Sequence, residues 1–482
     1  MDNTNDKGII GMENSRQKLK QRVLALITFM VAFITILAFF LFLMLVCTFK
    51  SKISDVFTTE RISSLNPRPR EFTRDVVVSL MFIGSSGGVA TLTENILQGM
   101  IVRRTNWRFI LLIRKDVTNP IFKRLATFKN VKMIEVDVSC YNYGLDEFLH
   151  SMFQKINNKR IKDRLIQLVF YDQLFLDHKC DVFWDPEAGL GWFNDFFAVA
   201  KISSIHDLAY HDTNCFPPEK AKWAEFRTNA LVKNSKKIIT VSDFSRKRVV
   251  DVFKLDPNSV RAIPIQMANR LNGGIKLTSR EIKAILSKYH LTPQNYFIYL
   301  SHYWPNKNHK RLLLAFEKYV KGTKSDLKLI LVGAGSSTID SYRKMVREKQ
   351  MEDRVIFSGF MSKENLQVVL ANALAFIHPS IYEGFGMPII EAMAAGVPVA
   401  CSTAGSLPEV AGNAALFFNP INVDEIEKAI ATMVSDGNLR KTLVERGYRQ
   451  AEKFANNSAM IDRYIQVFEE VMSESDRAKQ GE

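Results

Sequence analysis

Short apolar runs alternate with stretches of helical spacing along most of the chain. Runs rich in Val and Ile, which are typical of buried parallel strands, lie at 76–84, 108–115, 131–138, 181–185, 201–207 and 236–242. A second series follows at 296–301, 328–333, 355–360, 374–380 and 398–402. The alternation predicts an α/β protein with two successive doubly wound domains, joined by a linker near 271–278. Because ligands bind beyond the carboxyl ends of strands in such sheets, we expect functional residues directly after strands, in a cleft between the domains.

One apolar stretch is far longer than a strand. Residues 23–47 contain no charged residue in 25 positions, whereas a helix needs about 20 residues to cross a bilayer. No small-residue cleavage site follows, which disfavours a signal peptide, and a buried helix is the alternative. We expect an N-terminal tail at 1–22, a transmembrane anchor at 23–47 and a polar, proline-containing stalk at 48–74.

The net charge of +15 is unevenly distributed. Residues 1–350 carry 54 Lys and Arg against 32 Asp and Glu, whereas residues 351–482 carry 11 against 18. A basic front half behind a membrane anchor suits an anionic lipid surface or a phosphate-bearing substrate. Nucleic acid is not an expected partner, because the chain shows no zinc-ligand spacing, RNA-binding signature or basic-aromatic stripe. The five scattered cysteines form no C-x-x-C pair, which favours a reduced compartment.

Two groups of residues follow predicted strands in the first half. Gly87 and Gly88 stand between a strand and a helix, where glycine lets a phosphate approach the backbone. A tight strand-to-helix turn needs glycine as well, so both interpretations stay open. His206 and Asp207 end the run at 201–207. His206 can hydrogen-bond or polarise a substrate hydroxyl, but a lone histidine is also compatible with a structural role.

Two further candidates follow the strand at 296–301. Lys307 lies in the turn between this strand and the next helix, where a lysine can neutralise a diphosphate as a point charge. His302 lies at the mouth of the same turn.

The stretch HPSIYEGFGMPIIEAMAAGVPVACS, residues 378–402, places two carboxylates in an otherwise apolar sequence. It predicts a turn followed by a helix that begins at Gly386 or Met387, whose N–H groups suit a negative or hydroxyl-rich ligand. Glu383 lies in the turn and Glu391 lies one turn into the helix, so both can face one cleft and accept hydroxyl hydrogens of a sugar. A capping carboxylate and a surface glutamate are the alternative.

EGFGMPIIE fits an E-x7-E motif, and SGFMSKENL and GSLPEVAGNAALFFNP flank it in order. With these motifs the chain resembles retaining glycosyltransferase family 4 over about residues 80–470. The resemblance implies the GT-B fold, in which two Rossmann-like domains face each other across a cleft. The implied boundaries are 75–270 for the acceptor-side domain, 271–453 for the nucleotide-sugar-binding domain, 454–472 for a C-terminal crossover helix and 473–482 for a tail.

The same resemblance implies roles for the residues around the E-x7-E motif. Glu391 would hold the ribose hydroxyls of a nucleotide-sugar donor. Glu383 would contact the transferred sugar, beside the backbone of Phe385, Gly386 and Met387.

It also implies roles for the residues of the other loops. Lys307 would stabilise the departing diphosphate, and His206 would contact the donor sugar near the reaction centre. Gly87 and Gly88 would approach the diphosphate from the other domain. The family usually has an arginine where this chain has His302, which implies a weaker diphosphate clamp.

These expectations combine into a membrane-anchored, retaining hexosyltransferase that acts on a UDP- or GDP-sugar donor without a further cofactor. The chain has no D-x-D motif, so a metal-bridged diphosphate is not expected. The expected acceptor is a lipid-linked saccharide or polysaccharide, and mannose is a guess from the look of the EGFGMP block. The alternative is a non-catalytic scaffold that binds nucleotide sugar or glycan in a biosynthetic complex, which His302 would favour.

The orientation in the membrane follows from two opposed indications. Arg16, Lys18, Lys20 and Arg22 precede the apolar segment, whereas Lys50 and Lys52 follow it, so the positive-inside rule favours a translocated body. Nucleotide sugars are made in the cytosol, which favours a catalytic body on the cytosolic face, as in a bacterial inner-membrane protein. We expect the cytosolic face, with a luminal, type II arrangement left open.

Overall fold

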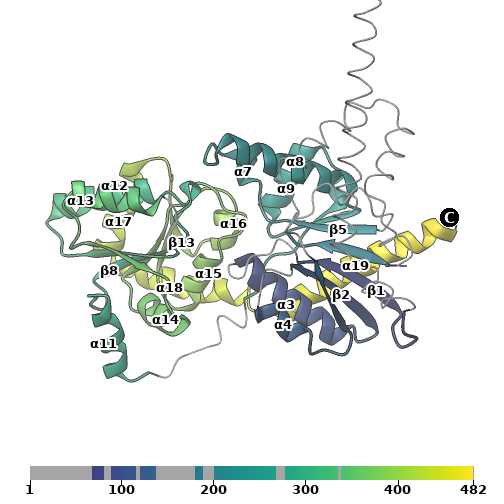
Figure 1. The fold of residues 1–482 in the computed structure, drawn as a ribbon. Coiled ribbons are helices and arrows are strands. Elements are labelled where there is room, and N and C mark those ends of the chain that lie inside the picture. The colour runs from purple at the N-terminus through teal and green to yellow at the C-terminus, as the bar shows by residue number, and fades with distance from the viewer. Residues whose placement is uncertain are drawn as a thin grey trace, which may run out of the picture. The chain divides into compact units, whose positions relative to one another are not determined.

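The computed structural model describes residues 68–80, 88–114, 120–136, 180–187, 200–267, 277–334 and 338–480. In Figure 1 the chain forms two open sheets, each accompanied by helices. The predicted α/β class with two successive sheets is confirmed. The predicted transmembrane anchor at 23–47 and Gly87 lie outside the described residues.

The first sheet has seven strands in the order β3-β2-β1-β4-β5-β6-β7. Its strands are β1 (Arg74–Ser79), β2 (Trp107–Arg114), β3 (Val131–Val136), β4 (Val182–Asp185), β5 (Ala200–Ile205), β6 (Lys237–Thr240) and β7 (Val260–Ala262). Strand β1 pairs in parallel with β2 and with β4. The pairs β4–β5, β5–β6 and β6–β7 are also parallel. The sequence pattern predicts all of these strands except the short β7.

Helices cover both faces of this sheet because successive strand residues point to opposite faces. Ile239 of β6 joins the core on the face of α3, whereas the preceding Ile238 packs with Leu231 and Val249 on the face of α8 and α9. Ser242 caps α9 by accepting a hydrogen bond from the N–H of Ser245. The helices are α3 (Gly88–Arg103), α4 (Pro120–Leu125), α7 (Ala209–Asp212), α8 (Pro218–Asn234) and α9 (Asp243–Phe253), with a 3-10 turn η2 (Pro257–Ser259).

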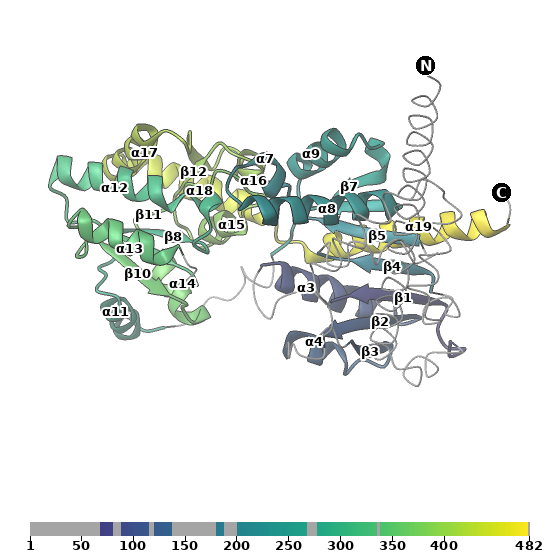
Figure 2. The same cartoon turned by 45° about the horizontal axis from the view of Figure 1, so that its top comes forward.

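The second sheet has six strands, all parallel, in the order β10-β9-β8-β11-β12-β13 (Figure 2). They are β8 (Tyr296–Leu300), β9 (Lys328–Val332), β10 (Val355–Gly359), β11 (Ala375–His378), β12 (Val399–Ser402) and β13 (Ala415–Phe418). The helices are α11 (Ser279–Lys288), η3 (Pro305–Lys307), α12 (His309–Thr323), α13 (Ile339–Glu348), α14 (Lys363–Ala371), α15 (Met387–Ala394), α16 (Leu407–Ala411), α17 (Val423–Ser435) and α18 (Gly437–Glu452). The pattern does not predict β13, which is four residues long.

The last helix, α19 (Asn457–Gln480), returns to the first sheet and packs beside α3 (Figure 1). Tyr464 and Phe468 contact the ring of Trp184 in β4 at centroid distances of 5.8 and 5.7 Å. Gly99 of α3 permits this approach, because a Cβ there would lie 2.6 Å from Ile461 of α19.

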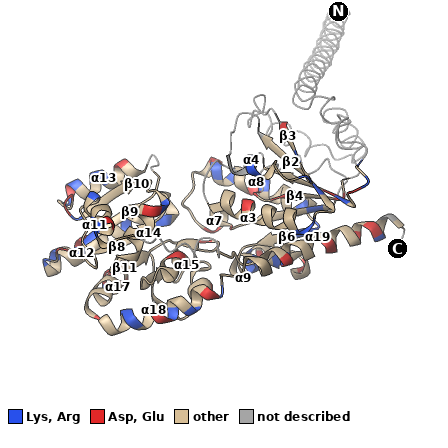
Figure 3. Cartoon of the chain, turned by 90° about the horizontal axis from the view of Figure 1, so that it is seen from below, with Lys and Arg blue, Asp and Glu red and all other residues tan. Residues whose placement is uncertain are grey.

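Acidic residues of α19 pair with basic residues of the first half. Asp462 pairs with Arg103, and Glu469 pairs with Arg104 at 2.7 Å. Figure 3 shows residues of both signs along the helices, with several acidic positions on α19. These pairs neutralise part of the basic excess of residues 1–350.

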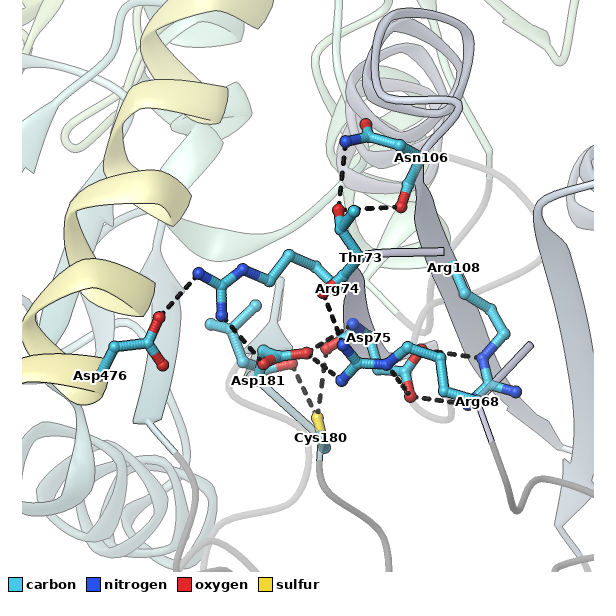
Figure 4. Close-up of polar contacts among 10 residues, drawn as sticks. Arg68, Thr73, Arg74, Asp75, Asn106, Arg108, Cys180, Asp181 and Asp476 are labelled. Carbon is cyan, nitrogen blue, oxygen red and sulfur yellow. Dashed lines mark hydrogen bonds and ion pairs between the residues drawn. The ribbon is translucent and has the colours of Figure 1, made fainter. Parts of the chain in front are cut away.

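A network of charged residues joins the start of the first sheet to its surroundings (Figure 4). Arg108 of β2 donates two hydrogen bonds, of 2.8 and 2.6 Å, to Asp75 of β1, and both side chains are less than a tenth exposed. Arg68 pairs with Asp75 at 3.2 Å and with Asp181. Arg74 bridges Asp181, at 3.2 Å, to Asp476 of α19, at 2.7 Å. The six side chains thereby tie the entering chain, two strand starts and the last helix together.

A cysteine beside this network stays a neutral thiol. Cys180 donates to the carbonyl oxygen of Val182 at 3.0 Å, and burial raises its pKa to about 12. Within the ranges that the structure describes, no helix is long and apolar enough to cross a membrane.

We expect Asp75→Ala to lower the free energy of unfolding by about 3–5 kcal/mol, because it leaves the buried Arg108 guanidinium without its carboxylate. Asp462→Ala is the matched control: its carboxylate is 65% exposed, so we expect a loss below about 1 kcal/mol. Urea unfolding of both variants at pH 7 measures the difference, and equal losses would contradict a structural role for the network.

Candidate functional site

The turn between β11 and α15 places charged and polar residues at the edge of the second sheet where its parallel strands end. Helix α15 begins at Met387 with Pro388 in its first turn, as the sequence predicts. Gly386 caps it with φ +95°, a left-handed conformation that a side chain would strain. Phe385 is 4% exposed and packs its ring against Phe454, so only its backbone can contribute to a ligand site.

Glu383 forms the centre of this turn. Its Oε1 accepts hydrogen bonds from Lys307 Nζ at 2.7 Å and from His378 Nε2 at 3.1 Å. Lys307 comes from the loop after β8, and His378 is the last residue of β11. The Glu383 side chain is 12% exposed and that of Lys307 is 23% exposed, so the pair is shielded but reachable from solvent. Three residues from two neighbouring strand ends therefore meet at one carboxylate oxygen.

Electrostatics keep this carboxylate ionised. Burial by itself would raise the pKa of Glu383, but the charge of Lys307 and the hydrogen bond from His378 outweigh burial and hold the pKa well below its usual range. Tyr299 reinforces the arrangement, because its hydroxyl donates to the carbonyl of Lys307 at 2.9 Å and lies 3.1 Å from Ser380 Oγ.

Asn308 fixes the loop that carries Lys307. It adopts a left-handed conformation with φ +61° at the start of α12. Its buried amide donates to the carbonyl oxygens of Pro379 and Pro420 at 2.9 and 2.7 Å. The lysine and glutamate loops are therefore tied together through the backbone as well as through their side chains.

Gly384 lies at one of the contacts between the loops of the two sheets. A Cβ at Gly384 would lie 2.3 Å from the carbonyl oxygen of His206, so no side chain fits there. The Gly384 carbonyl accepts hydrogen bonds from Ser242 and Ser245 at 2.7 and 3.3 Å, and Ser245 also donates to the His206 carbonyl at 3.0 Å. The turn that holds Glu383 thus sits directly against the end of β5.

His206 itself is held as a neutral ring. Burial lowers its pKa, and its Nε2 lies 2.9 Å from the carbonyl oxygen of Pro186. Asp207 does not orient the histidine, since its Oδ1 accepts from the Ala209 N–H at 2.9 Å and so begins α7. His206 lies at the sheet edge that the sequence predicts, with a fixed ring orientation.

Two further carboxylates form hydrogen bonds between residues near the first sheet and residues near the second. Glu409 of α16 accepts the N–H groups of Asp243 and Phe244, each at 2.9 Å, at the start of α9. Asp212 accepts hydrogen bonds from Arg248 at 2.6 and 2.9 Å and from the Tyr382 hydroxyl at 2.9 Å. Burial opposes ionisation of Asp212, but these hydrogen bonds lower its pKa to about 2.

The other predicted positions lie around this centre. Gly88 begins α3, and a Cβ there would lie 2.4 Å from Met387 Cε, so the glycine accommodates the methionine. His302 is exposed after β8, and Glu391 is partly buried in α15. The predicted roles of these residues stay predictions.

Sequence reasoning missed His378, Ser380 and Glu409 as members of the site. His378 stands inside the predicted strand 374–380, and only its place at the strand end marks it. Glu409 in SLPEVA follows a proline at a helix start, which signals a cap but not one for a distant helix. Across the described parts of the chain, no group of three or more His, Cys, Asp or Glu side chains could hold a metal ion.

Residues 282–450 match the family model described as glycosyl transferases group 1. This part of the chain resembles a group 1 glycosyltransferase. The chain is 32% identical to the O-antigen chain mannosyltransferase B of Escherichia coli over 260 residues, which are 53% of this chain and 66% of that protein. It is 30% identical to the O-antigen chain mannosyltransferase RfbU of Salmonella typhimurium over 205 residues, 42% of this chain and 53% of that protein. In both cases the chain spans less than two thirds of the relative, and the matches support a glycosyltransferase family.

Solved glycosyltransferase-like structures share the two-sheet architecture. Sucrose-phosphate synthase from Thermosynechococcus elongatus has a TM-score of 0.62 at 17% identity, covering 83% of this chain and 100% of that chain. HepE from Anabaena in complex with UDP and glucose has a TM-score of 0.61 at 16% identity, with the same coverage. At these identities the likeness shows the fold alone.

We expect Lys307→Met to lower the free energy of unfolding at pH 7 by about 2–3 kcal/mol, less than a fully buried pair because the lysine is partly exposed. The low folded-state pKa of Glu383 stabilises the wild type above the ordinary carboxyl pKa, and this stabilisation is lost as pH falls through the folded-state value. The difference between variant and wild type should therefore shrink as pH falls below the ordinary value of 4.5 toward the folded-state value, which a comparison of pH 7 with about pH 3 tests.

Lys318→Met is the matched control, since Lys318 and Asp424 form an exposed pair. We expect it to cost much less than Lys307→Met, because solvent screens an exposed pair. Urea unfolding at the two pH values measures both effects, and a Lys307→Met loss that does not change with pH would contradict the assigned ion pair.

Proposed function

We propose that this protein is a membrane-anchored, metal-independent, retaining glycosyltransferase of the family 4 type. It transfers a hexosyl group from a nucleotide-diphosphate sugar to a lipid-linked or polysaccharide acceptor. The observation that carries the proposal is the Lys307–Glu383 pair at 2.7 Å, set at the start of α15 and joined through Gly384 to the loop of His206. The names of the two O-antigen relatives support mannose as the transferred sugar.

The residues of the second sheet bind the donor in this proposal. The Lys307 ammonium faces the leaving diphosphate and stabilises the negative charge that develops on it. Glu383, kept ionised, accepts hydroxyl hydrogens of the transferred sugar, beside the backbone of Phe385, Gly386 and Met387. Glu391 holds the ribose hydroxyls.

The loops around these residues complete the donor site. The neutral ring of His206 contacts the donor sugar from the first sheet, and the role expected of Gly87 and Gly88 from the sequence is to contact the diphosphate. His302 stands near the diphosphate in place of an arginine, which weakens the clamp without removing it.

Metal independence rests on the sequence, which has no D-x-D motif. Lysine and the positive end of α15 then provide the charge stabilisation that a metal ion provides elsewhere. The proposed anchor is the segment 23–47, and the proposed location of the catalytic body is the cytosolic face, where nucleotide sugars are made.

We expect the full-length protein in detergent to bind one nucleotide class tightly in calorimetry against UDP-, GDP-, ADP- and dTDP-sugars. Glu391→Ala should weaken this binding by about tenfold or more, because it removes hydrogen bonds to a charged acceptor. Glu445→Ala, an exposed glutamate of α18, is the matched control and should bind as the wild type does.

The outcomes separate the candidate functions. Binding together with sugar transfer to a membrane extract supports the enzyme, whereas binding without turnover favours a scaffold. An absence of binding to every nucleotide sugar would overturn the proposal.

We expect protease added outside sealed inner-membrane vesicles of right-side-out orientation to leave the catalytic body intact. Detergent permeabilisation should then expose it to cleavage. Cleavage of the body in the sealed vesicles would place it on the opposite face and contradict the proposed location.

A further inference from the structure

Glu187 lies at the same sheet edge as His206 and has no part in the donor site. It lies two residues after the end of β4, and β4 pairs with β5 in the sheet. Its N–H donates to Asp185 Oδ1 at 3.1 Å, and the carbonyl of the intervening Pro186 lies 2.9 Å from His206 Nε2. The short turn from Asp185 to Glu187 is therefore fixed against the predicted reaction centre.

The carboxyl group of Glu187 lacks a hydrogen-bond partner for one of its oxygens. Oε2 is buried, and among the residues that the structure describes no group forms a hydrogen bond with it. Arg227 of α8 is close, but its guanidinium donates to the Glu187 backbone carbonyl at 3.3 Å and lies 4.1 Å from the Trp223 ring centroid. Leaving a buried polar atom without a partner costs free energy, so a purely structural role does not account for this carboxyl.

Three other shielded carboxylates each have a cationic partner. Asp75 accepts from Arg108, Asp212 accepts from Arg248, and Glu383 accepts from Lys307. Glu187 differs from them because one of its carboxyl oxygens lacks a hydrogen-bond partner among the described residues, and its pKa reflects the cost of burying the charged form. Burial raises its pKa to about 7, an effect that the charge of Arg227 opposes and that of Asp185 reinforces. Strongly perturbed carboxyl groups of this kind are concentrated at functional sites.

We propose that Glu187 binds a hydroxyl group of the acceptor saccharide, with its partly buried carboxyl group accepting the hydroxyl hydrogen. The assignment rests on the proposed glycosyltransferase function and names a residue that selects the acceptor. The donor groups Lys307 and Glu383 come from the second sheet, whereas Glu187 comes from the first, beyond the His206 loop. A saccharide hydroxyl is the matching chemistry because it can donate to an ionised carboxyl and also accept from a protonated one.

The test is steady-state kinetics of the full-length protein with the donor found by calorimetry and a membrane-extracted acceptor. We expect Glu187→Gln to lower kcat/KM for the acceptor by about 10- to 100-fold, the range for a lost hydrogen bond to a charged group. The dissociation constant of the donor should not change. Glu225→Gln, an exposed glutamate of the neighbouring α8, is the matched control and should keep the wild-type values for both substrates.

The pH profile separates substrate contact from a structural effect. The wild-type kcat/KM for the acceptor should rise with pH and level off above about pH 7, because the ionised carboxyl is the stronger acceptor, and Glu187→Gln should lose this rise. Of the charged groups that act on Glu187, Arg227 does not titrate in this range, because the pKa of a guanidinium lies far above it. Burial lowers the pKa of His206, whose ring contacts the Pro186 carbonyl. The Asp185 carboxylate accepts a hydrogen bond from the Glu187 N–H, which fixes the position of its side chain.

Thermal unfolding gives a readout that does not need activity. The raised pKa means that the folded protein keeps a proton that the unfolded chain loses above the ordinary value of 4.5, so the wild type loses stability as pH rises from there to about 7. Glu187→Gln avoids this loss, and its melting temperature should exceed that of the wild type at pH 8 more than at pH 4.5.

Two results would overturn the assignment. The first is a Glu187→Gln variant with unchanged acceptor kinetics and an unchanged pH profile while the wild type transfers sugar. The second is a variant that melts below the wild type at pH 8, which would show a structural carboxyl. A wild type that binds no nucleotide sugar would overturn the proposed function itself, and this assignment with it.

Discussion

Parallel strand pairing is the constraint on which the site depends. Parallel strands place their carboxyl ends at one edge of a sheet, so the loops that follow them converge whatever their distance in the sequence. Lys307 and Glu383 are 76 residues apart, yet they follow strands that pair directly with each other. His206 and the turn after β4 converge in the same way in the first sheet. The chemistry is thereby supplied by loops, and the sheets fix where those loops begin.

Within that frame, a shielded carboxylate must be paired or lose its charge. The turn before α15 meets this condition with a lysine, a histidine and a backbone approach that only glycine permits. The lysine is oriented by the glutamate before any ligand binds, which reduces the side-chain entropy lost on binding. The same condition explains the network at the opposite end of the first sheet, where three arginines and three aspartates hold strand starts and the last helix.

The hydrophobic pattern was sufficient for most of the fold, because buried parallel strands are long apolar runs that need no knowledge of their partners. It missed β7, which has only three residues, and β13, whose four residues ALFF include no Val or Ile. The site was predictable where glycine and charge interrupt apolar sequence, as at Glu383. His378 and Glu187 were not, because the burial of a histidine or a glutamate depends on residues distant in the chain, which no local spacing reveals.

The return of α19 to the first sheet has a consequence for synthesis of the chain. Strand β4, with Trp184, is made early, but the rings of Tyr464 and Phe468 that cover this tryptophan belong to the last helix. The ribosome therefore completes the whole second sheet while one apolar face of the first is still open to water. Domains usually fold in the order in which they emerge, and transiently exposed apolar surface favours aggregation. In this protein the first sheet to be made is the last to be finished, and its Trp184 face stays uncovered until α19 has been synthesised.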